Sequence, residues 1–156
     1  MASNLEFTDQ AKSECAKALS KVLSDTFIPY LKTHNFHWNV VGPKFLGIHR
    51  FLEDQYRDLW TSIDDIAERI RALGAMAPGT TMKFRELSEV RENDKVPGAQ
   101  DILRELVTDN ETVCRTMRAT LATAQAAGDE ATAGLVTDRL AYHEKQIWMM
   151  KSLLAS

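Results

Sequence analysis

An amphipathic stretch, residues 45–73, constrains the fold of this chain more than any other feature. At 100° per residue its apolar side chains fall within a sector of about 80°, which is one face of a 3.6-residue helix. They are Phe45, Ile48, Leu52, Tyr56, Leu59, Ile63, Ile66 and Ile70. No glycine or proline interrupts residues 48–73, and Gly74 follows as the expected C-cap. The pattern predicts one long helix with a buried stripe.

Three further long helices are expected. The first begins at the N-cap candidate Thr8 and runs to about Asn35, with a kink at Pro29, because proline removes a backbone donor. Another follows Pro97 and ends near residue 128, and the last begins after the N-cap candidate Asp129. Residues 75–98 link the second long helix to the third and contain a short amphipathic segment, 83–90.

A link of this length allows the second and third long helices to run parallel, unlike those of a simple up-and-down bundle. We therefore predict an all-α fold, a ferritin-like four-helix bundle with a long crossover that carries a short helix. We expect one domain over residues 1–156, with residues 1–7 as a short N-terminal tail.

Composition supports a globular domain and excludes several classes of protein. The 156 residues are 44% hydrophobic and 26% charged, which is typical of a chain with a full core. No apolar run approaches the roughly 20 residues of a membrane span, and no secretion signal is recognisable. Cys15 and Cys114 form no CxxC motif, which favours a reducing cytoplasm. The net charge of −3 gives no support to general nucleic-acid binding.

Imidazoles and carboxylates flank the apolar stripe at helical spacing. His49 and Glu53 form one i,i+4 pair, Asp64 and Glu68 form another, and His37 lies just before the Gly42–Pro43 turn. Such groups are metal ligands in outline, while the absence of thiolates argues against a closed structural zinc site.

The spacing of these groups raises a geometric problem. His49 and Asp64 are 15 residues apart, or roughly 22 Å along a helix axis, whereas ligands lie within about 2.6 Å of their metal. One chain therefore cannot bring both pairs to one ion. Two antiparallel copies related by a two-fold axis can do so, which predicts two identical sites between subunits.

With these residues in view, the chain resembles the Dps proteins, or mini-ferritins, over essentially its whole length. The specific part is H-W-N-x-x-G-x-x-F-x-x-x-H-x-x-x-E from residue 37, followed by D-D-I-A-E-R from residue 64. The resemblance implies that one subunit supplies His37, His49 and Glu53. The two-fold partner then supplies Asp64 and Glu68 to a di-iron or single-iron site. Glu53 stands where the family commonly has Asp.

The resemblance also implies a function and an assembly. It implies a hollow homododecamer that is a ferroxidase, oxidising Fe(II) with hydrogen peroxide or dioxygen, storing ferric mineral and limiting oxidative damage. The alternative is a non-catalytic DNA-binding or structural dodecamer whose site is vestigial or holds zinc. Strong DNA binding is not expected, because residues 1–10 contain no Lys or Arg. A large-ferritin site inside one subunit is disfavoured by the absence of any Glu-x-x-His motif.

Several residues outside this pattern have simpler interpretations. We expect His34 at the end of the first helix, His143 as a satisfied core or interface histidine, and Met150 as core filler. Trp38 matches the tryptophan that the family has beside its site. Trp60 is expected to pack at the two-fold interface.

Overall fold

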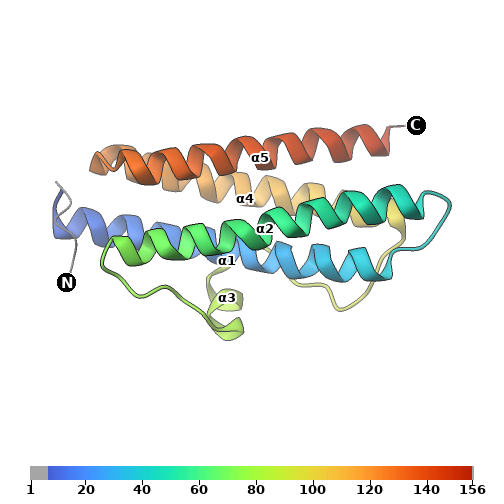
Figure 1. Ribbon diagram of the computed structural model, residues 1–156, viewed down its shortest axis with the longest axis horizontal. Helices are drawn as coiled ribbons and strands as arrows, with labels where there is room; N and C mark the ends of the chain where they lie inside the picture. Colours follow the sequence, from blue (N-terminus) through green and yellow to red (C-terminus); the bar gives the residue numbers. More distant parts are fainter. Residues whose placement is uncertain (1–6, 156) are drawn as a thin grey trace.

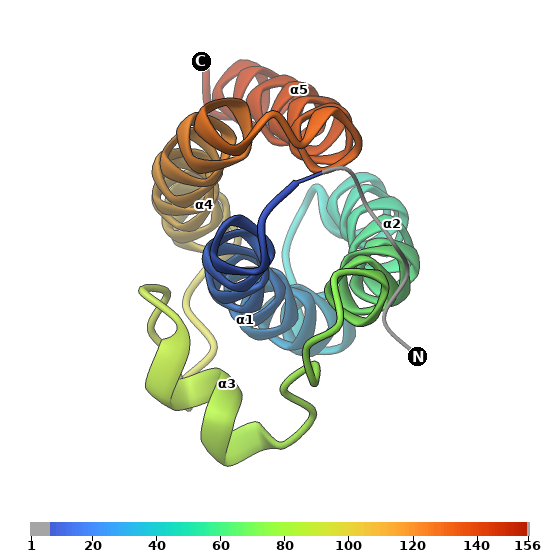
Figure 2. The same cartoon turned by 90° about the vertical axis from the view of Figure 1, so that its left-hand side faces the viewer.

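The computed structural model describes residues 7–155, and among these it contains five helices and no strand (Figure 1). They are α1 (Asp9–Asn39), α2 (Phe45–Ala72), α3 (Thr81–Leu87), α4 (Ala99–Ala127) and α5 (Glu130–Leu154). The four long helices form a bundle, and α3 lies outside it beside α1 (Figure 2). As predicted, α2 and α4 run in the same direction. The predicted tail, residues 1–7, falls outside the described residues except for Phe7, which packs against the core.

The helix ends are set by the residues that the sequence indicates. The Thr8 side chain accepts a hydrogen bond from the Ala11 N–H at 3.1 Å, and Asp129 accepts one from the Thr132 N–H at 3.0 Å. Gly74, with φ +92°, follows α2 in a left-handed conformation that favours glycine. These observations confirm both N-cap predictions and the role of Gly74.

Two element boundaries differ from the prediction. The first helix continues through Pro29 and ends at Asn39 rather than near Asn35, so that His37 is a helical residue. The Asn39 amide donates to the Asn35 carbonyl at 3.0 Å, and no glycine or proline occurs between Asn35 and Gly42 to stop the helix. The short helix was predicted at 83–90 and spans Thr81–Leu87. It begins earlier because Thr80 caps it, accepting from the Lys83 N–H at 3.2 Å.

Two groups of buried apolar side chains fill the bundle, one toward each end. The first lies where α1 begins and α2 ends, and the second where α1 ends and α2 begins. From the predicted stripe of α2, the fully buried side chains are Ile48, Leu52, Leu59, Ile66 and Ile70. Met150 is buried as predicted. Because the stripe packs into the core, the opposite face of α2 is turned away from it.

A buried carboxylate ties the crossover to the bundle. Asp25 in α1 is inaccessible to solvent and accepts hydrogen bonds from the Ser88 hydroxyl at 2.7 Å and the Glu89 N–H at 2.7 Å. Its second oxygen accepts from the Thr116 hydroxyl of α4 at 2.6 Å. One side chain therefore joins α1, α4 and the segment that follows α3.

Two sequence-based expectations concern membranes and cysteines. None of the helices described is both long and apolar enough to cross a bilayer. Cys15 and Cys114 are buried free thiols. Burial raises the pKa of Cys114 to about 11, so this thiol is a packing residue rather than a metal ligand or nucleophile.

Candidate metal centre

Two histidines meet where α1 ends and α2 begins. The rings of His37 and His49 stack with centroids 3.8 Å apart and planes at 15°. His37 is buried and His49 is half-buried. The turn at residues 40–44 brings the two helices together here, because Gly42 has a positive φ of 126° that few other residues adopt.

Each histidine is held by the backbone of the other. The Nδ1 of His37 lies 2.7 Å from the carbonyl oxygen of His49, and the Nδ1 of His49 lies 2.7 Å from the carbonyl oxygen of His37. A carbonyl only accepts, so both Nδ1 atoms are the protonated donors. The Nε2 atom of each neutral ring then carries the lone pair that a metal ion needs.

Glu53 lies one turn after His49 and is half-buried, with 36% of its side chain exposed. Its Oε1 accepts hydrogen bonds from Nη2 of Arg57 at 2.9 Å and Nε of Arg57 at 3.2 Å. These hydrogen bonds lower the pKa of Glu53, and the charge of Arg57 adds to this shift against the opposing effect of desolvation. The carboxylate is therefore ionised at neutral pH, which suits a metal ligand.

Asp64 and Glu68 lie elsewhere on α2, on its exposed side. Because α2 is one continuous helix, the 15 residues from His49 to Asp64 correspond to roughly 22 Å. Asp64 lines an open surface hollow of about 530 Å³ with Trp60, Ile63 and other residues of α2. Within residues 7–155 of one protomer, no three His, Cys, Asp or Glu side chains converge on a metal-sized space. Within the protomer the rings of His37 and His49 are in contact, and Glu53 lies near them without completing a metal-sized cluster.

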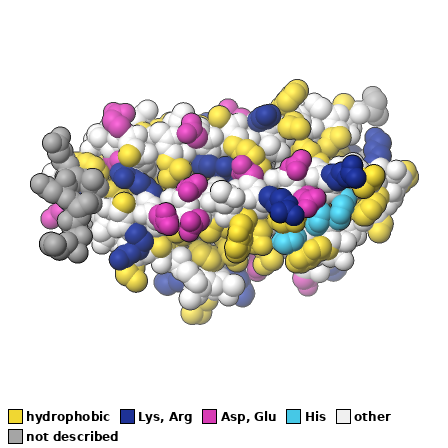
Figure 3. All heavy atoms as spheres, viewed as in Figure 1, with side chains coloured by type: hydrophobic (Ala, Val, Ile, Leu, Met, Phe, Trp, Pro, Cys, Tyr) yellow, Lys and Arg dark blue, Asp and Glu magenta, His cyan; other side chains and the backbone are white. Residues whose placement is uncertain are grey.

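Large apolar side chains surround the histidines on the surface. Figure 3 shows histidine side chains beside hydrophobic ones on the face that it presents, with acidic side chains further along it. Trp38 is 61% exposed and Trp60 is 60% exposed. Three exposed apolar residues at and after the turn that precedes α2, which we call the apolar rim, are Val41, Leu46 and Phe45, and the Phe45 ring stacks on that of His49. So much apolar surface is typical of a site that another protein surface covers.

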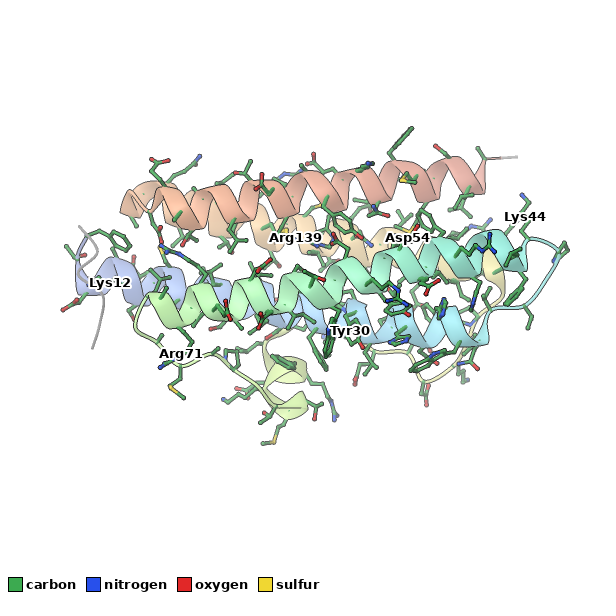
Figure 4. All side chains as sticks on the ribbon, in the orientation of Figure 1. Lys12, Tyr30, Lys44, Asp54, Arg71 and Arg139 are labelled. Carbon is green, nitrogen blue, oxygen red and sulfur yellow. The ribbon has the colours of Figure 1, made fainter. Side chains whose placement is uncertain are left out.

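His34 is not at the end of the first helix, because that helix extends to Asn39. Its ring stacks on Tyr56 with centroids 3.8 Å apart, and its Nδ1 lies 3.2 Å from the hydroxyl of Tyr30. Tyr30 lies where α1 adjoins α2 (Figure 4). Burial lowers the pKa of His34, and the charge of Arg57 lowers it further. His34 thus packs beside the candidate ligands within an aromatic group.

His143 is a core histidine, as predicted, but it is only partly satisfied. Its Nδ1 donates to the side-chain oxygen of Asn110 at 2.7 Å, since the Asn110 amide nitrogen donates to the Leu106 carbonyl at 2.7 Å. Its Nε2 is buried without a hydrogen-bond partner in the part of the chain described. Burial, followed by the charge of Arg139, lowers the pKa of His143 to about 3.

The fold and the two-histidine site define a class of protein, and comparisons with known proteins agree. The family described as the ferritin-like domain matches residues 16–156, so the chain belongs to the ferritin-like family. A solved structure of the Dps protein from Vibrio cholerae O1, described as a member of a broad superfamily of ferritin-like diiron-carboxylate proteins, is similar throughout. It has 29% identity and a TM-score of 0.93, and the alignment covers 99% of this chain and 98% of that one.

Curated relatives show to which group within the ferritin-like family the chain belongs. The chain is 33% identical to a DNA protection during starvation protein of Helicobacter pylori, over 88% of this chain and 96% of the relative. It is 32% identical to DNA protection during starvation protein 2 of Bacillus anthracis, over 88% and 94% of the two chains. Within the ferritin-like family this chain is a Dps mini-ferritin.

Sequence reasoning missed two features of the site. Arg57 was overlooked although it follows Glu53 at i+4, the spacing at which helical ion pairs form. The reciprocal histidine–carbonyl bonds could not be foreseen, because they depend on how two helices meet at a turn.

Proposed function

We propose that this Dps mini-ferritin is a cytoplasmic ferroxidase that oxidises Fe(II), with hydrogen peroxide as the main oxidant and dioxygen as the alternative. Two-fold-related subunits of a homododecameric cage share each site, and the ferric mineral is stored inside. The overall change is 2 Fe(II) + H₂O₂ + 2 H⁺ → 2 Fe(III) + 2 H₂O. Consuming Fe(II) and peroxide together protects the cell from hydroxyl radicals.

The observation that carries this proposal is the reciprocal bonding of His37 and His49. It fixes both rings as Nδ1–H tautomers and leaves two Nε2 lone pairs beside the ionised Glu53. Outer hydrogen bonds of this kind orient metal-binding histidines and raise their basicity. Two imidazoles with carboxylates suit Fe(II), and the carboxylates favour Fe(III) as it forms.

The protein residues have separate tasks in this proposal. His37 and His49 would bind Fe(II) through Nε2 without loss of a proton, because their N–H groups already point to carbonyls. Carboxylates of both subunits would offset the positive charge of the oxidised ion. Glu53 reaches one methylene further than the aspartate that the family commonly has.

A shared site is supported by two features of the protomer. The pair Asp64 and Glu68 is too far along α2 to join the histidines of its own chain. The apolar rim beside the histidines is exposed in the protomer and would be buried by a partner, as would Trp60. Antiparallel pairing of two α2 helices would place the carboxylates of each subunit at the histidines of the other.

We further propose that DNA is not bound strongly at physiological salt. Two of the three lysines near the start of α1 are in ion pairs, Lys12 with Asp9 at 3.3 Å and Lys21 with Glu89 at 2.6 Å. These contacts reduce the basic surface that the start of α1 offers to phosphates. The family's DNA-protection role would then follow from iron chemistry rather than from coating DNA.

The test adds Fe(II) anaerobically to the purified apo-protein, then hydrogen peroxide, and follows ferric absorbance and peroxide consumption. We expect fast oxidation with soluble ferric mineral that stays with the protein. His49→Gln should slow the initial rate by at least about tenfold. His34→Gln, which removes a neighbouring imidazole outside the ligand set, should retain most of the rate. Oxidation of Fe(II) no faster than in buffer would favour the zinc-binding or structural alternative.

A further inference from the structure

The positively charged side chain of Arg57 is bonded to Glu53, one of the proposed iron ligands. Arg57 directs Nε and Nη2 at the same carboxylate oxygen of Glu53, at 3.2 and 2.9 Å. Two donors on one oxygen use the lone pairs with which that oxygen would bind a metal ion. Glu53 is therefore engaged by a positive charge in the structure without metal.

The position of the guanidinium is defined by a second contact. Its central carbon lies 5.6 Å from the centroid of the Tyr56 ring. Tyr56 in turn stacks on His34, and its ring centroid is 5.1 Å from that of His37. Arg57 thus rests on the aromatic group that adjoins the histidines, although 67% of its side chain is exposed. It can leave Glu53 without disturbing the core.

We propose that Arg57 is a positioning residue that competes with the metal ion for Glu53. It holds the carboxylate in position while the site is empty, and it must give up Oε1 when a divalent cation binds there. Because like charges repel and a shared oxygen is a weaker ligand, Arg57 lowers the affinity of the site for divalent cations. This inference rests on the proposed ferroxidase site.

The test uses Co(II), a divalent ion that the site can bind in anaerobic buffer without turnover. Wild-type protein, Arg57→Gln and Arg57→Lys are titrated at pH 7 and fixed ionic strength, with calorimetry and the visible absorbance of bound Co(II) as readouts. We expect Arg57→Gln to bind about tenfold more tightly, equivalent to ~1.4 kcal/mol. Arg57→Lys keeps the charge but not the two-donor contact, so its affinity should be intermediate.

A matched control is available on the same helix. Arg50 is exposed and precedes Glu53 by three residues, and among the described residues it forms no ion pair with Glu53. Arg50→Gln removes the same charge and should change the Co(II) affinity by less than about twofold. Equal or weaker binding by Arg57→Gln would overturn the competition between Arg57 and the metal ion. If the wild type bound no Co(II), the metal site would be wrong, and both the proposed function and this inference would fall.

Discussion

Two histidines from different helices orient each other at the candidate metal site. His37 donates to the backbone of His49, and His49 donates to the backbone of His37. A side chain bonded to a carbonyl is oriented by the helix that carries that carbonyl. The site is thus pre-organised before any metal arrives, which reduces the free-energy cost of binding.

A third histidine has a structural effect that depends on pH. His143 is buried between α4 and α5, with Nδ1 bonded to Asn110 and Nε2 without a partner among the described residues. Arg139 lies between α5 and α2 (Figure 4), and its charge adds to the effect of burial on the His143 pKa. The ring is therefore neutral in the folded protein at all ordinary pH values.

Acid should destabilise the protein through His143. Its pKa is about 3 when folded, below the usual 6.5, so between these values the unfolded chain binds a proton that the folded chain does not. Stability from this residue is complete above pH 6.5 and falls as the pH drops toward 3, by at most ~1.4 kcal/mol per pH unit. The variant His143→Gln should show a flatter dependence of the unfolding free energy on pH.

Denaturant unfolding at pH 7, 5 and 4, at a fixed subunit concentration, measures this dependence. The carboxylates titrate in both proteins, so the difference between wild type and variant isolates the histidine. Parallel curves for the two proteins would show that His143 does not contribute.

At the scale of the element, the crossover depends on one buried group. Asp25 receives two donors from residues 88–89 and one from Thr116 of α4. The stacking of Phe84 on Phe27, at 4.5 Å, is the apolar contact that adds to these bonds. Together they hold α3 against α1 and allow α4 to start in parallel with α2.

Removing this group should loosen the crossover. Asp25→Ala removes the acceptor of three hydrogen bonds, two of them donated by the buried residues Ser88 and Thr116, and should cost about 3 kcal/mol or more of unfolding free energy. Thr116→Val removes only one of the three hydrogen bonds and should cost about 1–2 kcal/mol. Denaturant melts give both values, and limited proteolysis shows whether cleavage begins between residues 75 and 98. A loss below 1 kcal/mol in Asp25→Ala would contradict this role.

At the scale of the whole molecule, the site and the assembly are expected to be inseparable. One protomer offers His37, His49 and Glu53 near one end of α2, and Asp64 with Glu68 roughly 22 Å away along it. The end with the histidines lacks the carboxylate pair, and the end with the carboxylate pair lacks histidines. A two-fold axis resolves this, since each subunit then completes the site of its partner.

Mixed cages test the shared site directly. His37→Ala and Asp64→Ala should each abolish rapid Fe(II) oxidation without preventing assembly. In a mixed dimer one of the two sites has only native ligands, so random one-to-one mixing should restore about a quarter of the wild-type rate. Native mass spectrometry confirms that subunits have mixed. No recovery in a confirmed mixed cage would show that the site lies within one subunit.

The sequence by itself determined the elements of this protein. The length of the crossover predicts the parallel arrangement of α2 and α4. Four long helices and the caps at Thr8 and Asp129 follow from apolar periodicity and local hydrogen bonding. These are short-range properties that depend on a few neighbouring residues. The C-terminal end of the first helix and the start of the short helix were less predictable. The signals that stop a helix near residue 35 and start one near residue 80 are weak.

The tertiary structure alone decided how the side chains of the site are used. Periodicity placed His49 and Glu53 on one face of a helix, but only packing showed that His49 exchanges hydrogen bonds with His37 of another helix. It also showed that His34 of α1 stacks on Tyr56 of α2. These contacts depend on the distance and rotation between two helices. The distance and rotation between the helices are set by packing throughout the core. A local sequence pattern does not encode them.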